Sequence, residues 1–223
     1  MTVCVRPVHG DACLWINEWR KRHAKGEVII VRYADDFVMG FACEEDARQV
    51  LDVLPKRFGK YGLTLHPAKT RLVPFQRPPR RPARKGSTKG SPPGSFDLLG
   101  FTHYWSLSRK GNWVVKRKTA KSRLTRALRM VTRWCQVHRH QPIAEQHRTL
   151  SRKLKGHFAY YGITGNGSAL AMFHREVTRT WRKWLSRRHR RGGYAWPQFT
   201  RLLERYPLPR PVVVHSVYRR AAK

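Results

Sequence analysis

Apolar residues in the first third of the chain form short runs of the kind that strands use. Residues 28–31 are β-branched throughout, and residues 37–41 are largely apolar. The five residues between them, 32–36, include two adjacent acids, so the pattern predicts strand, turn and strand. Because both runs are apolar at successive positions, we expect both strands to be central and covered on both faces.

Helical spacing flanks this hairpin on both sides. Residues 11–23 form an amphipathic pattern that ends at Gly26, and the acids at 44–46 suit the first turn of a helix that ends near 59–62. Residues 63–66 and 70–73 are short strand candidates. This β-β-α-β order predicts an α+β fold with a helix packed on one sheet face.

A Pro-, Gly- and Arg-rich stretch, residues 76–95, predicts an exposed basic loop. Order resumes at Phe96. Gly111 and Asn112 form a good turn between apolar runs at 104–105 and 113–115, which predicts a second hairpin.

From Ala120 onward the apolar period becomes helical. The pattern predicts one helix from Ala120 past Cys135 and a second over about 144–161. It predicts a third that begins near Ser168, is capped after residues 165–167 and extends to Leu185. Three successive helices predict a small bundle. Beyond residue 191 the chain is broken by prolines, and we expect a partly disordered basic tail.

The charge is far from ordinary. The chain has 47 Lys and Arg against 13 Asp and Glu, a formal net charge of +34. Nucleic acid is the partner that such a charge favours, although a ribosomal-type structural protein or a membrane-surface binder would also be basic. Only Glu145, Glu176 and Glu204 follow Asp97 among the acids. This asymmetry indicates a catalytic first half and a nucleic-acid-binding second half.

Cysteine spacing and hydropathy indicate the state of the thiols and the cellular compartment of the protein. The four cysteines show no CxxC spacing, no signal peptide precedes them, and no apolar run is long enough to cross a bilayer. We expect free thiols and a soluble, cytoplasmic protein.

Asp35 and Asp36 are the candidate metal ligands. Adjacent carboxylates at a hairpin tip repel each other unless a divalent cation neutralises them, and oxygen ligands favour Mg²⁺. Because strand side chains alternate, we expect Asp35 to be the firm ligand and Asp36 a second or alternate one. The plain alternative is a polar turn without a metal.

Four blocks resemble one family, in matching order. Residues 31–37 resemble the YxDD motif of reverse transcriptases, in the YADD form common in bacterial group II intron-encoded proteins. Residues 65–70 resemble the next block, 96–101 the primer-grip block, and 156–162 with the following helix the thumb, or maturase X domain, of group II intron proteins.

The resemblance implies an RNA-directed DNA polymerase that binds intron RNA and an RNA template with a DNA primer, from a mobile element that also serves RNA splicing. It implies a partial palm over 1–118 with the basic loop 76–95, a thumb over 119–191, and a basic tail over 192–223. Mg²⁺ would be held by Asp35 and Asp36, with Lys69 near the incoming nucleotide. The implied nucleic-acid contacts are Tyr33, Gly100, Lys116, Arg117, Lys118 and Arg123.

Departures from the family pattern qualify this expectation. The earlier aspartate-bearing palm strand, the Gly-rich block and the fingers do not occur, residues 1–10 resemble nothing, and no HNH-type nuclease follows. We therefore expect a C-terminal part that does not polymerise alone and acts with a separately made N-terminal half. A non-catalytic RNA-binding maturase module and a decayed gene product are the alternatives.

Several aromatic and basic residues have plainer explanations. Core packing is favoured over base stacking for Trp181 and Trp184, and a packed ring over catalysis for His157. Single basic clusters are usually solvated surface, but their repetition along three helices with few acids favours phosphate binding.

Overall fold

The structure is a computed structural model that describes residues 2–5, 11–33, 36–62, 64–65, 70–79, 94–188 and 193–216. The chain forms two compact units, residues 1–117 and 118–223. The first unit combines helices with two antiparallel sheets, and the second is built of helices. The prediction of an α+β fold is therefore confirmed.

A four-stranded antiparallel sheet lies at the centre of the first unit, with strand order β2-β3-β1-β4. The predicted first hairpin is confirmed as β2 (Val28–Tyr33) and β3 (Asp36–Phe41), and β4 (Arg71–Val73) confirms the strand predicted at 70–73. β1 (Thr2–Val5), which the sequence pattern did not predict, lies between β3 and β4.

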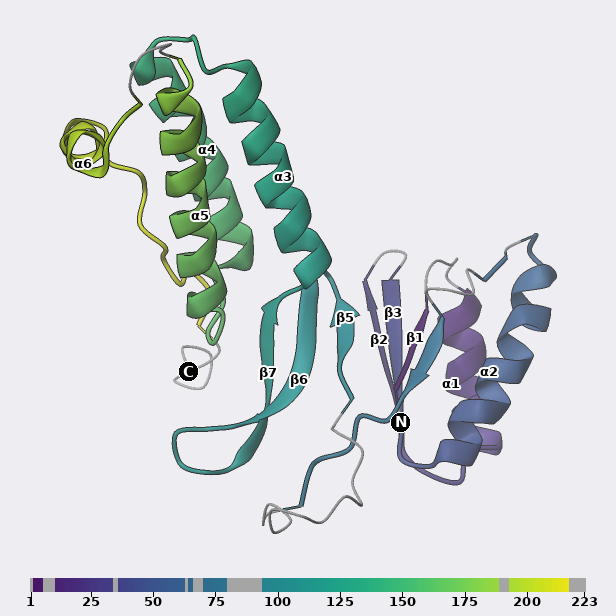
Figure 1. Cartoon of the computed structure of the whole chain (residues 1–223). Coiled ribbons are helices and arrows are strands. Elements are labelled where there is room, and N and C mark those ends of the chain that lie inside the picture. Colours follow the sequence, from purple (N-terminus) through teal and green to yellow (C-terminus); the bar gives the residue numbers. More distant parts are fainter. Residues whose placement is uncertain are drawn as a thin grey trace, which may run out of the picture. The chain divides into compact units, whose positions relative to one another are not determined.

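Two helices cover one face of this sheet. α1 (Asp11–Arg22) and α2 (Glu44–Gly59) lie side by side on it (Figure 1). Alternate residues of the strands point at the helices because strand side chains alternate between faces. The core on this side contains Ile16, Trp19, Val28, Phe37, Met39, Phe41, Ala47, Val50, Leu54 and Phe58.

The opposite face is covered only in part. Val38 of β3 packs there against Phe96 and the half-buried Phe75. On β2, by contrast, Ile29 is 54% exposed and Val31 is 50% exposed. The prediction of two covered central strands is thus confirmed for β3 and wrong for β2, which is an edge strand with an open face.

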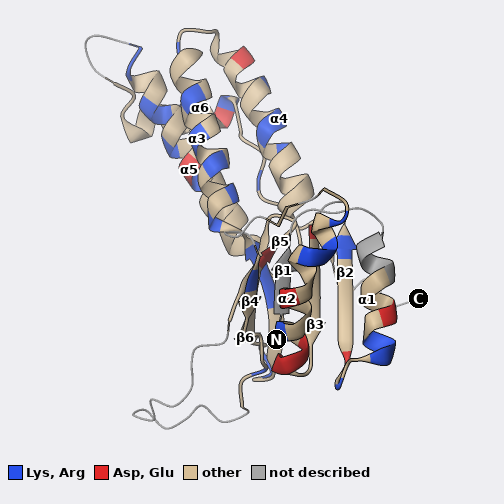
Figure 2. Ribbon diagram, turned by 90° about the vertical axis from the view of Figure 1, so that its right-hand side faces the viewer, with Lys and Arg blue, Asp and Glu red and all other residues tan. Residues whose placement is uncertain are grey.

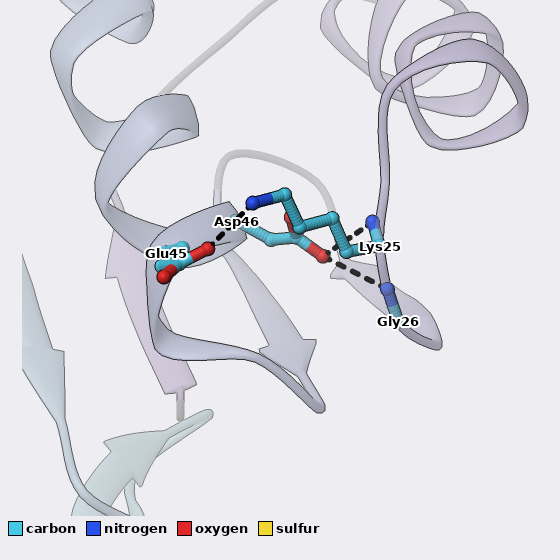
Figure 3. Close-up of polar contacts among 4 residues, drawn as sticks. All are labelled: Lys25, Gly26, Glu45 and Asp46. Carbon is cyan, nitrogen blue, oxygen red and sulfur yellow. Dashed lines mark hydrogen bonds and ion pairs between the residues drawn. The ribbon is translucent and has the colours of Figure 1, made fainter.

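A buried carboxylate fixes the turn that leads into β2. Asp46, in the first turn of α2, is 1% exposed, and its Oδ2 accepts hydrogen bonds from the backbone N–H groups of Lys25 (2.9 Å) and Gly26 (3.0 Å), as Figure 3 shows. Gly26 has no room for a side chain, because a Cβ there would lie 2.9 Å from the Cys43 Sγ. The junction between α1 and the hairpin is therefore rigidly specified.

A second, three-stranded sheet lies in the first unit, and the last two residues of its final strand belong to the second unit. It has the order β5-β6-β7, formed by β5 (Phe96–Leu98), β6 (Phe101–Leu107) and β7 (Trp113–Thr119). The hairpin predicted around Gly111 and Asn112 is confirmed as β6 and β7.

The segment between the two sheets contains less regular structure than the sequence predicts. The strand predicted at 63–66 is wrong at residues 64 and 65, and its other two residues lie outside the described part of the chain. The predicted loop 76–95 is described only at 76–79 and 94–95, where the backbone has no regular structure.

Three long helices form the bundle predicted for the second unit. α3 (Lys121–Val137), α4 (Ile143–Tyr161) and α5 (Gly167–Ser186) lie alongside one another (Figure 1). Their shared core includes Leu150, Leu154, Phe158, Leu170, Phe173, Val177, Trp181 and Leu185. None of the described helices combines the length and apolar character needed to span a bilayer.

The expectation of a partly disordered tail is wrong over residues 196–205. These residues form α6 (Trp196–Arg205), whose Phe199 is fully buried and packs edge-on against Trp181, with ring centroids 5.7 Å apart. The apolar residues of α6 recur at helical spacing, and Pro197 lies in its first turn. Proline is tolerated in the first turn of a helix.

The third helix begins at Gly167, one residue before the predicted start at Ser168. Asn166 precedes α5, but its side chain makes no cap hydrogen bond. Its Oδ1 accepts from the Thr119 backbone N–H (2.9 Å), and its Nδ2 donates to Thr119 Oγ1 (2.9 Å) and to the Tyr161 carbonyl (2.8 Å). This buried residue joins the end of β7 to the corner between α4 and α5.

Core packing is confirmed for the aromatic residues of the bundle. Trp181 is fully buried and its Nε1 donates to the Oε1 of Gln146 at 3.0 Å, and Trp184 is buried as well. His157 stacks on Phe173 with ring centroids 3.8 Å apart, and burial lowers the pKa of its imidazole to about 4.

Candidate active site and nucleic-acid interface

The predicted metal motif lies at the tip of the β2–β3 hairpin. Tyr33 ends β2, Asp36 begins β3, and the two residues are directly opposite each other in the antiparallel register. Ala34 and Asp35 are the two residues between them in the sequence. Asp35 lies outside the described residues, and its role as the firm ligand stays a prediction.

The register places Tyr33 and Asp36 on the open face of the sheet. Directly opposed residues share a face, and Tyr33, Val31 and Ile29 alternate with the residues that face the helices. Tyr33 is 65% exposed and Asp36 is half-buried. A ligand could therefore reach this end of the hairpin from the face that α1 and α2 leave uncovered.

The strand beside this hairpin supplies no carboxylate. β1 pairs with β3 from Thr2 opposite Gly40 to Val5 opposite Phe37, and its four residues are Thr, Val, Cys and Val. Sequence reasoning missed this neighbour because a four-residue apolar segment without a turn partner has no distinctive pattern. β1 therefore completes the sheet without adding a third metal ligand.

The donor set fits a metal that substrate helps to hold. Among the described residues, no three His, Cys, Asp or Glu side chains come together as a metal site. Mg²⁺ is commonly bound by one or two carboxylates plus substrate phosphates rather than by a protein cage. Asp36 with its neighbour Asp35 suits that kind of site. Lys69, the other predicted catalytic residue, lies outside the described part of the chain.

Gly100, predicted to contact nucleic acid, lies in the tight turn between β5 and β6. Leu98 pairs with Phe101, and the two residues between them both have positive φ, 50° at Leu99 and 79° at Gly100. Glycine adopts this conformation freely, whereas a leucine there is strained by about 1–2 kcal/mol. The turn therefore holds a large apolar side chain in an unfavourable backbone state.

The predicted basic cluster at 116–118 is divided between two faces of β7. Lys116 and Lys118 alternate with Arg117, so they point to the opposite side of the strand. Arg117 is close enough to His103 to help lower the pKa of that imidazole, after the larger effect of burial. The structure thus separates Arg117 from the two lysines. Arg123 lies in the first turn of α3 and is half-buried.

Cations extend far beyond this cluster in the helical unit. Figure 2 shows Lys and Arg recurring along α3, α4 and α5, whereas acids are sparse there. Of the three acids in the helical half, Glu176 pairs with Arg175 (3.5 Å) and Arg179 (3.1 Å). The helical half therefore has too few acids to pair with most of its basic side chains.

Each of the two compact units matches a different protein family. Residues 14–103 match the reverse transcriptase (RNA-dependent DNA polymerase) family, and residues 124–202 match the group II intron, maturase-specific domain. The chain belongs to the group II intron reverse transcriptase and maturase family. A search of curated proteins found no significant match.

The two family matches coincide with the structural features described above. The reverse transcriptase match contains the YADD hairpin and the β5–β6 turn, and the maturase match extends from α3 into α6. Both family matches imply that the chain binds nucleic acid. The roles of individual residues stay predictions.

Proposed function

We propose that the chain contributes the YADD-bearing palm and the thumb of an RNA-directed DNA polymerase of group II intron type. The observation that carries this proposal is the pairing of β2 with β3, in which Tyr33 and Asp36 lie opposite each other on an open sheet face. Intron RNA, and a template with its primer, are the nucleic acids that the cationic helices would bind.

Asp35 and Asp36 would hold Mg²⁺ in this proposal. When bound there, Mg²⁺ would supply positive charge that activates the attacking 3′-hydroxyl and stabilises the leaving oxygens. Lys69 would stand near the incoming nucleotide and deliver a proton to the pyrophosphate that leaves. Tyr33, next to the carboxylates and largely exposed, would contact the nucleic acid.

A further carboxylate is needed for a complete two-metal site. Because β1 carries none, we propose that it comes from another polypeptide segment, such as a separately made N-terminal half. Polymerisation by these 223 residues alone would then be absent.

Primer extension on an RNA template with Mg²⁺ tests this function. We expect no extension by the chain alone, and extension when it is combined with the fingers and aspartate-bearing palm strand of a group II intron reverse transcriptase. Asp36→Asn should abolish the restored activity, whereas Asp52→Asn, which changes an exposed acid of α2, should retain it. Restored extension that survives Asp36→Asn would refute the proposal.

A non-catalytic maturase role is the second candidate, favoured by the acid-poor helical unit. This role requires RNA binding but no bound metal at the hairpin. An intron splicing assay separates the two functions, because Asp36→Asn would leave splicing unchanged while it abolishes primer extension. Loss of splicing in a folded Asp36→Asn variant would exclude a role independent of the hairpin.

A further inference from the structure

A groove of about 610 Å³ runs along α4 in the helical unit. Its walls are α4 and the segment that follows α6, residues 206–209. Ligand sites commonly have volumes of roughly 300–1,000 Å³, so the groove is large enough to take a nucleotide-sized group. All of its lining residues belong to one compact unit.

One wall of the groove is cationic. Arg148, Arg152 and Lys155 line it at helical spacing and are exposed. None of the three forms an ion pair with any residue that the structure describes. Glu145, the single acid of α4, lies in the first turn of the helix. These three charges are therefore available to an anion.

The other wall is aromatic and proline-rich. Tyr206 and Pro207 form it, and the His147 Nε2 donates a hydrogen bond to the Pro207 carbonyl at 2.9 Å. The rings of His147 and Tyr206 lie 5.6 Å apart. This hydrogen bond and ring contact hold the wall against α4 before any ligand binds.

Further along, the same segment is tied to the corner between α4 and α5. The backbone N–H groups of Val214 (2.7 Å) and His215 (2.8 Å) both donate to the Gly162 carbonyl. Figure 1 shows the segment after α6, in yellow, returning toward this corner. Both ends of the wall are thus anchored, so the groove is preformed.

We propose that this groove binds single-stranded RNA, with backbone phosphates on Arg148, Arg152 and Lys155 and a base against Tyr206. This inference deepens the proposed function and rests on it, since it names the site through which the helical unit would hold RNA. A cationic wall facing an aromatic wall is the arrangement by which proteins bind single strands without reading sequence.

The length of the cationic wall agrees with several phosphates. With a rise of about 1.5 Å per residue, Arg148 and Lys155 are roughly 10 Å apart along the helix axis. Three cations spread over this length can each neutralise one phosphate of a strand that follows the helix.

Binding of a labelled single-stranded RNA to the full chain, measured against salt concentration, tests the proposal. The groove variant is Arg148→Gln, Arg152→Gln, Lys155→Gln. The matched control is Arg126→Gln, Arg129→Gln, Arg133→Gln, which removes the same charge from exposed positions of α3. Thermal melting by circular dichroism verifies that both variants are folded.

We expect the groove variant to reduce the slope of log affinity against log salt by about 2, because a single strand releases roughly 0.7 counterion per phosphate neutralised. The control should reduce it by less than half as much. Tyr206→Leu, which keeps an apolar side chain but removes the flat ring, should weaken single-strand binding about tenfold through lost stacking. Duplex RNA should be little affected by this change.

Three results would refute the groove as the RNA-binding site without refuting RNA binding by the chain. These are equal losses in the groove and control variants, an unchanged affinity in Tyr206→Leu, and equally tight binding of a polyglutamate peptide to the groove. A wild-type chain that binds no RNA would instead refute the proposed function itself.

Discussion

The carboxylate of Asp46 stabilises the first unit through hydrogen bonds to the backbone. Its carboxylate is buried, and it accepts hydrogen bonds from two successive backbone N–H groups in the turn before β2. Asp46→Ala would leave both donors without a protein acceptor. Because a hydrogen bond to a charged group contributes about 1.5–3 kcal/mol, we expect a loss of roughly 2–4 kcal/mol in the free energy of unfolding, measured with urea.

Glu45→Ala is the matched control for Asp46. Glu45 meets the Lys25 Nζ at 2.7 Å, but both side chains are at least 70% exposed. Exposed ion pairs contribute about 0–1 kcal/mol, so the control should change little. Equal losses in the two variants would show that the backbone contacts of Asp46 are unimportant.

His157 makes the helical unit sensitive to acid. Burial among aromatic rings lowers its pKa from the usual 6.5 to about 4. Between these pH values the unfolded chain binds a proton that the folded chain does not, so the free energy of unfolding falls as pH falls from 6.5 towards 4. Above pH 6.5 this residue contributes no pH dependence.

The change His157→Phe should flatten this dependence. The phenyl ring retains the stack on Phe173 but binds no proton. Melting temperatures between pH 7 and pH 4 would measure the difference, with a remaining slope expected from His174, whose pKa burial also lowers. Identical pH profiles for the wild type and the variant would contradict the prediction.

At the scale of elements, Asn166 connects a strand end to a helix corner. Asn166→Ala would remove three hydrogen bonds and leave the buried Thr119 N–H without its acceptor. We expect a loss of about 2–4 kcal/mol in chemical unfolding of the helical unit. Ser168→Ala, an exposed neighbour, should change the free energy by less than about 0.5 kcal/mol.

Local pattern predicted most elements correctly, and the failures were failures of tertiary context. The hairpins and the three long helices follow from runs and periods within 20 residues. Whether β2 is an edge or a central strand depends on which strand lies beyond it, and its composition carries no such information. Asn166 has the right residue type for a cap, yet buried partners 47 positions away bind its side chain instead.

Prediction of the candidate sites from sequence is limited by tertiary context in the same way. The adjacent acids and the turn could be located from sequence, because a hairpin loop is local. The groove beside α4 could not, since its second wall lies about 60 residues further along the chain than its first. Arg148, Arg152 and Lys155 resemble any solvated helix face until Tyr206 is placed opposite them.

For the whole molecule, the formal charge of +34 predicts strongly salt-dependent binding. A protein that contacts 6–10 phosphates loses about 10³–10⁵ in affinity between 50 and 200 mM salt. We expect the chain to lose at least about 10³ with a long RNA, measured by filter binding. A flat salt response would show that the basic residues do not contact the backbone.

The position of β1 affects the order in which the first unit can fold. Val3 pairs with Met39 on one side and Leu72 on the other. Closing such long loops is entropically costly and slows folding. During synthesis the first strand leaves the ribosome well before either partner. The nascent chain must therefore keep an unpaired apolar strand from aggregating until residue 73 has emerged.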